Sequence, residues 1–346
     1  MITNQSTNKI QQNLIIEKTE RLNPLYKYVE DIKNKIKASA SAVYVIQENK
    51  VIGELYSGLC PLTSREIVEN SRFNIYSARK SYIGLAVAIL IIDMRILNVD
   101  DEVRNYLEGL DDVICNKLTL RHLVTHTHGL RFEKNKLVKV ASPGTIWEYN
   151  DAGLVLLYRI IKSVSDKDVN QIIREYVFKP LGFTESGWEI TNHNNLVADI
   201  FESSENPKVR LDDLTGFERN LFVSARELAH WGYLHLNKGN LNGKQIFTKE
   251  LFELTTTSHT PKEMINTHQN GFFWFKNENQ YIKSELGEVV PPTSYQILGA
   301  SGCTCLVMPE LNAVAVRMYN KIGNPDGYDY LRDIKNFGNL VSTLLK

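Results

Sequence analysis

The stretch Phe73–Ile92, FNIYSARKSYIGLAVAILII, limits how this chain can fold more than any other part of the sequence. It opens with a short extended pattern and continues as a helix that ends in an unbroken apolar run, 83–92. A helix that is apolar on all sides is buried, and this run is too short to cross a bilayer. Ser77 and Lys80, at the start of the helix, therefore share one face of a core element.

Ser77 and Lys80 could form a nucleophile and its activator on one rigid element. A serine in the first helical turn lies near unpaired backbone N–H groups and the positive end of the helix dipole, which favour an oxyanion. The apolar run behind Lys80 would strip water from its amine and favour the neutral base. Taken alone, however, Ser-x-x-Lys more often reflects a helix-capping serine followed by a solvent-facing lysine.

The composition indicates an ordinary globular protein. With 346 residues, of which 43% are hydrophobic, the chain is long enough for two lobes or one large α/β unit. Lysine and arginine (40) balance aspartate and glutamate (40), so nothing suggests a nucleic-acid partner. Four cysteines do not make a disulfide framework in so long a chain, and the N-terminus lacks a secretory pattern. We expect a cytoplasmic protein with reduced thiols and no membrane contact; the oligomeric state stays open.

The order of patterns along the chain predicts an α+β fold. Strand patterns occur near both ends, at 41–47, 51–57, 271–275, 295–298, 304–308 and 313–319. Helical patterns occur at 21–38, 77–95, 152–164, 168–178, 225–237 and 328–345. We therefore predict an α/β sandwich whose antiparallel sheet, built from both chain ends and flanked by helices, carries an inserted helical lobe. The expected divisions are a polar N-terminal extension (1–20), a discontinuous sheet lobe (21–76 and 266–346) and a helical lobe with the nucleophile (77–265).

A second informative segment is 118–130, LTLRHLVTHTHGL. It reads as a short helix that Thr119 caps and that Gly129 ends in a left-handed conformation. It also contains three histidines, His122, His126 and His128. The first two would share a helix face, but the third would not, and no acidic ligand is close in sequence. We therefore favour packing and turn hydrogen bonds over a metal site.

Three segments together carry a family resemblance: FNIYSARK at 73–80, the segment 118–130, and PGTIWEY at 143–149. In this order they are similar to the serine β-lactamase and penicillin-binding-protein superfamily, above all to its class C-like branch of esterases, D-aminopeptidases and acyltransferases. The resemblance covers about residues 40–320 and includes FVSARELAHWGYLHLNKG at 222–239. No single motif is decisive, but the three together favour a catalytic role for the Ser-x-x-Lys pair.

The resemblance implies that a tyrosine of a Tyr-x-Asn loop faces the Ser–Lys pair. The matching residues are Tyr149, Asn150 and Asp151. Tyr149 would accept or relay the serine proton and later pass it to the leaving group. Asp151 departs from the usual asparagine, and a carboxylate beside Lys80 favours the ammonium form of that lysine. This moves the role of proton acceptor towards Tyr149.

The family's third element is a Lys-Thr-Gly or His-x-Gly triplet, and here Ala300-Ser301-Gly302 stands in its place. The resemblance implies that Gly302 keeps the strand open to substrate and that the backbone N–H of Cys303 pairs with that of Ser77 as an oxyanion hole. Ala300 replaces the family's cation, so recognition of a substrate carboxylate is poorly supported. Ser301 remains as a neutral hydrogen-bonding group.

These expectations describe a serine hydrolase with a small-molecule acyl substrate, an ester, amide or lactam, with a carboxylesterase-like activity preferred. Ser77 attacks the acyl carbonyl, Tyr149 and Lys80 transfer the proton, and water or another nucleophile resolves the acyl-enzyme. No cofactor or metal is required. Two alternatives stay open: an acyltransferase, in which an alcohol or amine takes the acyl group, and a non-catalytic binding protein, which the changes at 151 and 300 suggest.

Overall fold

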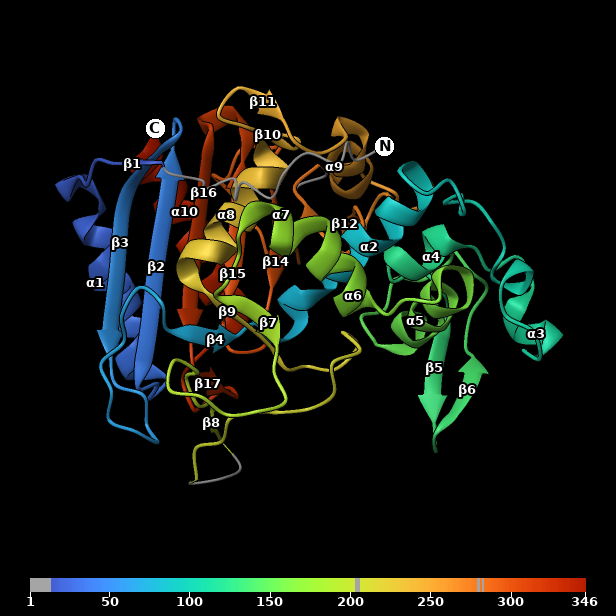
Figure 1. Ribbon diagram of the computed structural model, residues 1–346, viewed down its shortest axis with the longest axis horizontal. Coiled ribbons are helices and arrows are strands. Elements are labelled where there is room, and N and C mark those ends of the chain that lie inside the picture. Colours follow the sequence, from blue (N-terminus) through green and yellow to red (C-terminus); the bar gives the residue numbers. More distant parts are fainter. Residues whose placement is uncertain (1–13, 203–205, 279–280, 282) are drawn as a thin grey trace.

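One large sheet draws its strands from both ends of the chain (Figure 1). The computed structural model describes residues 14–202, 206–278, 281 and 283–346. Within them the sheet has the order β1-β3-β2-β16-β15-β14-β13-β12, with all neighbours antiparallel except β1 and β3. Its strands are β1 (Ile15–Ile16), β2 (Ala40–Gln47), β3 (Lys50–Gly58), β12 (Gln269–Asn270), β13 (Phe275–Lys276), β14 (Tyr295–Leu298), β15 (Thr304–Met308) and β16 (Ala313–Tyr319). The predicted α+β fold, with its sheet assembled from both termini, is confirmed.

Both faces of this sheet are buried. Side chains of a strand alternate between the two faces, so each face contributes to a separate hydrophobic cluster. In β2, Ala42, Tyr44 and Ile46 belong to one hydrophobic cluster, whereas Val43 and Val45 belong to the other. The strand therefore reads as a continuous apolar run rather than an alternating one.

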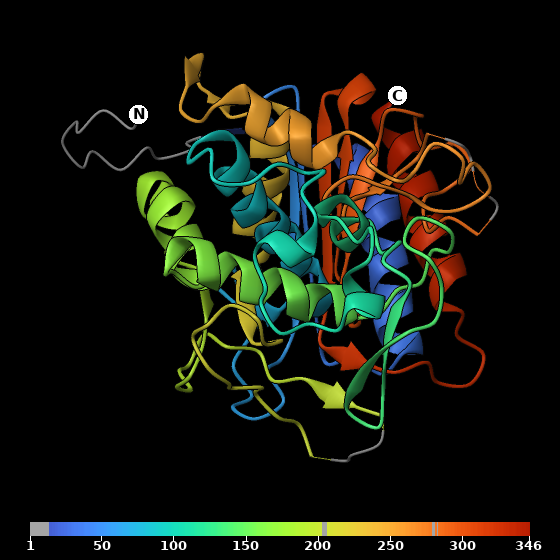
Figure 2. The ribbon, with the colours of Figure 1, turned by 90° about the vertical axis from the view of Figure 1, so that its right-hand side faces the viewer.

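Helices cover the two faces of the sheet. On one side, α1 (Asn23–Lys35) and α10 (Tyr330–Leu345) pack together, as Figure 2 shows in blue and red. On the other side, α8 (Ala225–Leu236) packs against β2, β15 and β16. Because α8 belongs to the range 77–265, that range contributes directly to the covering of the sheet. The lobe boundaries stay a prediction, and residues 1–13 of the expected N-terminal extension lie outside the described residues.

The remaining elements surround these layers. The other helices are η1 (Glu20–Leu22), η2 (Tyr76–Arg79), α2 (Lys80–Ile92), η3 (Val103–Asn105), α3 (Asp112–Cys115), α4 (Leu120–Val124), α5 (Ala152–Ser165), α6 (Val169–Ile173), the π-helical turn η4 (Arg174–Phe178), α7 (Lys179–Leu181), α9 (Lys249–Thr256) and η5 (Pro309–Leu311). The small sheets are β4 (Arg72–Asn74), β9 (Leu221–Ser224) and β7 (Ser186–Trp188); β5 (Leu130–Glu133) and β6 (Lys136–Lys139); β8 (Ile200–Phe201) and β17 (Lys321–Ile322); and β10 (Asn240–Leu241) and β11 (Lys244–Gln245). No helix in the described ranges has both the length and the apolar character to cross a membrane.

The helix α2 is buried from Lys80 to Leu90, as its apolar sequence predicts. Tyr82 stacks on Trp231 of α8, with ring centroids 3.9 Å apart and an interplanar angle of 9°. Gly84 admits the backbone of Phe272, because a Cβ at this glycine would lie 2.8 Å from the Phe272 carbonyl oxygen. The start of α2 is therefore held from several sides, and this fixes the residues that precede it.

Two sequence predictions about local structure are wrong. The segment 271–275 is not a strand: β12 ends at Asn270, β13 begins at Phe275, and Phe273 between them has φ 67°. A left-handed residue cannot continue a strand, and the N–H of Phe273 donates instead to the carbonyl of Val124. Gly129 is also not the end of a helix, because α4 already ends at Val124 and Gly129 (φ 65°) leads into the unexpected hairpin of β5 and β6.

Candidate active site

The candidate nucleophile lies in a tight turn rather than in the first turn of an α-helix. Ser77 is the second residue of η2, which leads directly into Lys80 at the start of α2. A 3₁₀ helix has three residues per turn, so residues i and i+3 lie on the same face. The Lys80 N–H donates to the Ser77 carbonyl. The Ser77 side chain is half-buried and Lys80 is 1% exposed.

The residue before Ser77 adopts a strained conformation. Tyr76 has φ 48°, in the left-handed region that a bulky residue rarely enters. Two contacts hold it there: its N–H donates to Asn74 Oδ1 (3.0 Å), and its hydroxyl donates to Asp199 Oδ2 (2.7 Å). Burial raises the pKa of Asp199 to about 8. Strain of this kind persists only where the surroundings enforce it, so the position of Ser77 is fixed. No local sequence signal marked Tyr76 or Asp199.

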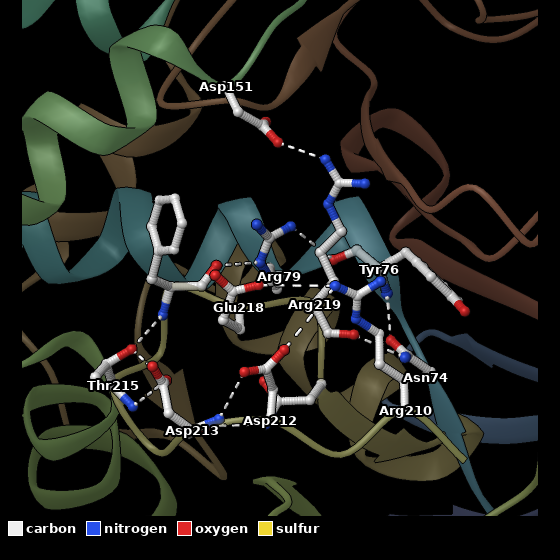
Figure 3. A network of polar contacts seen from close by, with 12 residues as sticks. Asn74, Tyr76, Arg79, Asp151, Arg210, Asp212, Asp213, Thr215, Glu218 and Arg219 are labelled. Carbon is white, nitrogen blue, oxygen red and sulfur yellow. Dashed lines mark hydrogen bonds and ion pairs between the residues drawn. The ribbon is translucent and has the colours of Figure 1, made fainter. Parts of the chain in front are cut away.

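The Lys80 amine forms an ion pair with the carboxylate of Asp151. The sequence analysis expects this carboxylate beside Lys80. Lys80 Nζ lies 2.9 Å from Asp151 Oδ1. The second oxygen, Oδ2, accepts a hydrogen bond from Arg219 Nη2 at 2.7 Å (Figure 3). Burial opposes ionisation of Asp151, but Lys80 and Arg219 outweigh it and hold the pKa of this carboxyl well below its usual range. Asp151 is therefore a carboxylate, and Arg219 is a site residue that the sequence motifs did not reveal.

Tyr149 meets Lys80 through the face of its ring. Lys80 Nζ lies 3.9 Å from the ring centroid, a cation–π contact. The ring is 43% exposed and packs 4.6 Å from the ring of His126. Burial and the nearby Lys80 ammonium hold the pKa of His126 well below its usual range, so this histidine is neutral.

The Ser77 hydroxyl has no hydrogen-bond partner among the residues that the structure describes, so the serine stays available to a substrate.

The turn that follows β14 packs directly against the segment that precedes the nucleophile. A Cβ at Gly299 would lie 2.3 Å from the Ile75 carbonyl oxygen, so only glycine fits this contact. Gly302 (φ 77°) donates its N–H to the Gly299 carbonyl at 3.0 Å. Cys303 precedes β15, and burial raises the pKa of its thiol to about 12, so the thiol is neutral. Pairing of its backbone N–H with that of Ser77 as an oxyanion hole stays a prediction.

The other two residues of this turn differ in exposure. Ala300 is exposed. It presents only a methyl group at the position where the resemblance implies a lysine or histidine. Ser301 is 2% exposed, and its hydroxyl has no partner in the described part of the chain. Its proposed role as a neutral hydrogen-bonding group is compatible with that free hydroxyl.

A buried ion pair supports the turn from behind. Arg317 is fully buried, and its Nε and Nη2 each donate to the Gly302 carbonyl at 3.3 Å. The same guanidinium donates to both carboxylate oxygens of Asp333, each at 2.9 Å. Asp333 lies in α10, so this pair connects the turn to the helix that covers the opposite face of the sheet.

Replacement of Asp333 by asparagine should lower the free energy of unfolding by about 3–5 kcal/mol, because it leaves the Arg317 charge buried without its partner. Urea denaturation of both proteins gives this difference. Asp31→Asn is the matched control, since Asp31 forms an exposed pair with Lys27, and it should change stability by less than about 0.5 kcal/mol. A loss for Asp333→Asn as small as that of the control would contradict the structural role.

Two of the three histidines of 118–130 serve local structure, and the third, His126, packs against Tyr149. His122 Nδ1 accepts a hydrogen bond from the Thr119 N–H (3.1 Å), which completes the capping of α4. His128 Nδ1 accepts one from the Leu130 N–H (3.0 Å), and burial lowers the pKa of His128 to about 4. No group of three or more His, Cys, Asp or Glu side chains suited to a metal ion occurs in the described ranges.

Comparison with known proteins identifies the family of the chain. The Beta-lactamase family model matches residues 27–336. An uncharacterized protein of Alkalihalophilus pseudofirmus is 38% identical over 320 residues, which cover 92% of this chain and 94% of that protein. Among solved structures, EstCE1, described as a hydrolase with promiscuous acyltransferase activity, superposes with a TM-score of 0.73 at 17% identity over 92% of this chain and 98% of that one. A penicillin-binding protein homolog of Caulobacter crescentus superposes with a TM-score of 0.74 at 14% identity, over 95% and 98% of the two chains. The similarity extends through the segments that hold Ser77, Lys80 and Asp151, and this chain belongs to the Beta-lactamase family.

Proposed function

We propose that this protein is a serine hydrolase that forms an acyl-enzyme on Ser77. The observation that carries the proposal is the convergence of Lys80, Tyr149 and Asp151 beside the fixed turn that presents Ser77. A nucleophile, a group that can take its proton and a residue that orients this group are the parts that acyl transfer requires. Four free, buried cysteines suit a reducing compartment, so the proposed location is the cytoplasm.

These contacts support the following reaction. Ser77 Oγ attacks the carbonyl carbon of the substrate, and the backbone N–H groups of Ser77 and Cys303 stabilise the oxyanion that forms. Because the Lys80 amine is already paired with Asp151, Tyr149 accepts the serine proton, and the cation–π contact with Lys80 stabilises the negative charge that develops on its ring oxygen. The proton then passes to the leaving group, and water resolves the acyl-enzyme. No step requires a cofactor.

The proposed substrates are esters or amides without a carboxylate next to the scissile bond, because Ala300 offers that carboxylate no charge. A charged anchor contributes about 1.5–3 kcal/mol through its hydrogen bonds, so its absence lowers affinity by one to two powers of ten. We expect a short-chain aryl ester to exceed a chromogenic cephalosporin in kcat/KM on the purified protein. Ala300→Lys should narrow the gap, and Ala300→Ser is its uncharged control. Efficient cephalosporin hydrolysis with poor ester turnover would contradict the assignment and favour a β-lactamase.

Acyl transfer is the second candidate, since EstCE1 is described as a hydrolase with promiscuous acyltransferase activity. Partition of the Ser77 acyl group between water and an added alcohol or amine separates the two functions. Dominant transfer at millimolar acceptor would favour the transferase. A non-catalytic binding protein would show neither product and would not be acylated at Ser77.

A further inference from the structure

Arg219 reaches the site from a loop far from the catalytic motifs. It is 68 residues from Asp151 in sequence, and its side chain is 48% exposed, whereas that of Lys80 is 2% exposed. Each cation occupies a different oxygen of the same carboxylate. The negative charge of Asp151 is therefore divided between a buried amine that belongs to the reaction and a guanidinium that does not.

The loop that carries Arg219 is fixed to the turn of the nucleophile. The Arg219 carbonyl accepts a hydrogen bond from Asn74 Nδ2 (2.8 Å), and Asn74 Oδ1 accepts one from the Tyr76 N–H. Two residues earlier, the Phe217 carbonyl accepts a hydrogen bond from Arg79 Nε at 2.9 Å. Figure 3 shows these contacts side by side. Arg219 is therefore held in place towards Asp151 rather than free on the surface.

From this geometry we propose that Arg219 is a positioning residue that sets how tightly the Lys80–Tyr149 couple holds its proton, by sharing the Asp151 carboxylate with Lys80. The inference rests on the proposed function, because it concerns the same acylation step. Without Arg219, the full negative charge of Asp151 would act on the couple and hold its proton more strongly. With Arg219 paired to the same carboxylate, part of that charge is compensated. Arg219 thus allows the couple to release its proton at lower pH.

The other charges around Asp151 act in the same direction or are already paired. Arg79 is buried beside it, and burial lowers the pKa of Arg79 to about 10, so it remains a cation at neutral pH. Glu218 is 3.7 Å from Arg210, which also faces Asp212. His126 is neutral, as shown above. Lys80 and Arg79 both belong to the helical segment that carries Ser77, whereas Arg219 contacts Asp151 from outside that segment, so its removal changes the charge at Asp151 and leaves the segment itself unaltered.

The test measures the rate at which a fluorophosphonate probe labels Ser77 in the full-length protein as a function of pH. In Arg219→Gln the acidic limb of this profile should move up by about half a pH unit, since a lost half-exposed cation leaves the proton more tightly held. In Asp151→Asn the limb should move down, because the anion is lost and the cations remain. Arg219→Lys should lie close to the unmodified protein, because it restores the charge.

Arg210→Gln is the matched control, because it removes an arginine from the same network that does not contact Asp151 (Figure 3). Its acidic limb should stay in place. If Arg219→Gln lowers the labelling rate equally at every pH, or leaves the limb in place while Ser77 is still labelled, the inference is wrong and the proposed function stands. If the unmodified protein is not labelled at Ser77 at any pH, the proposed function itself fails.

Discussion

Replacement of Ser77 by alanine is expected to abolish covalent labelling and to lower ester turnover by at least about 10³-fold, because loss of the nucleophile in a catalytic unit removes most of its rate enhancement. The fold should remain, since the side chain is half-buried and its hydroxyl has no partner in the described structure. Circular dichroism and urea denaturation check the fold, and labelling followed by mass spectrometry checks the chemistry.

Ser81→Ala is the control for this variant. Ser81 lies four residues further along the same helical segment, and its hydroxyl donates to the Ala78 carbonyl and accepts from Trp231 Nε1. Its replacement should lower stability by about 1–2 kcal/mol and leave labelling intact. If Ser77→Ala kept full turnover, or if Ser81→Ala lost labelling while it stayed folded, the assignment of the nucleophile would be wrong.

The second large effect is expected at the groups that move the proton. Lys80→Ala and Tyr149→Phe should each slow acylation by about 10²–10⁴-fold, which is the usual contribution of a positioned acid or base. Lys80→Ala removes the ammonium that stabilises the phenolate, and Tyr149→Phe removes the oxygen that takes the proton. Because the two residues act as a couple, the double variant should be little slower than the slower single variant.

Rapid-mixing measurement of acylation with an aryl ester gives these rates separately from deacylation. Tyr233→Phe is a suitable control, since its hydroxyl donates to Asn49 Oδ1 away from the site, and it should leave acylation unchanged. Strictly multiplicative losses in the double variant would mean that the residues act independently. A Tyr149→Phe protein with normal acylation would transfer the role of proton acceptor to Lys80.

The sheet and its helical layers could be predicted because their signals are local. The continuous apolar run of β2 and the capping of α8 by Ser224, which accepts from the Glu227 N–H, are both encoded within a few residues. The segment 271–275 departs from the predicted strand because Phe273 is left-handed, and contact with Val124 across the fold determines this conformation. Propensity favours a strand for such an aromatic run, and tertiary packing overrides it.

In the candidate site, too, some contacts can be predicted from the sequence and others cannot. The pair Ser77 and Lys80 is visible in the sequence because helical spacing brings i and i+3 together. The contact of Asp151 with Lys80 followed from the motif. Arg219 could not be found, because its contact with Asp151 joins two surface segments that share no pattern. The strain at Tyr76 also has no sequence signal, since it comes from its hydrogen bonds to Asn74 and Asp199.

The most direct test of the account is to identify the acylated residue in the unmodified protein. The purified protein would be incubated with a fluorophosphonate probe, its intact mass measured, and the adduct located by peptide mapping. The account predicts one adduct per chain, on Ser77, and loss of ester turnover in proportion to labelling. Full turnover in a protein whose Ser77 stays unmodified, or an adduct on another residue that alone accounts for the inhibition, would contradict it.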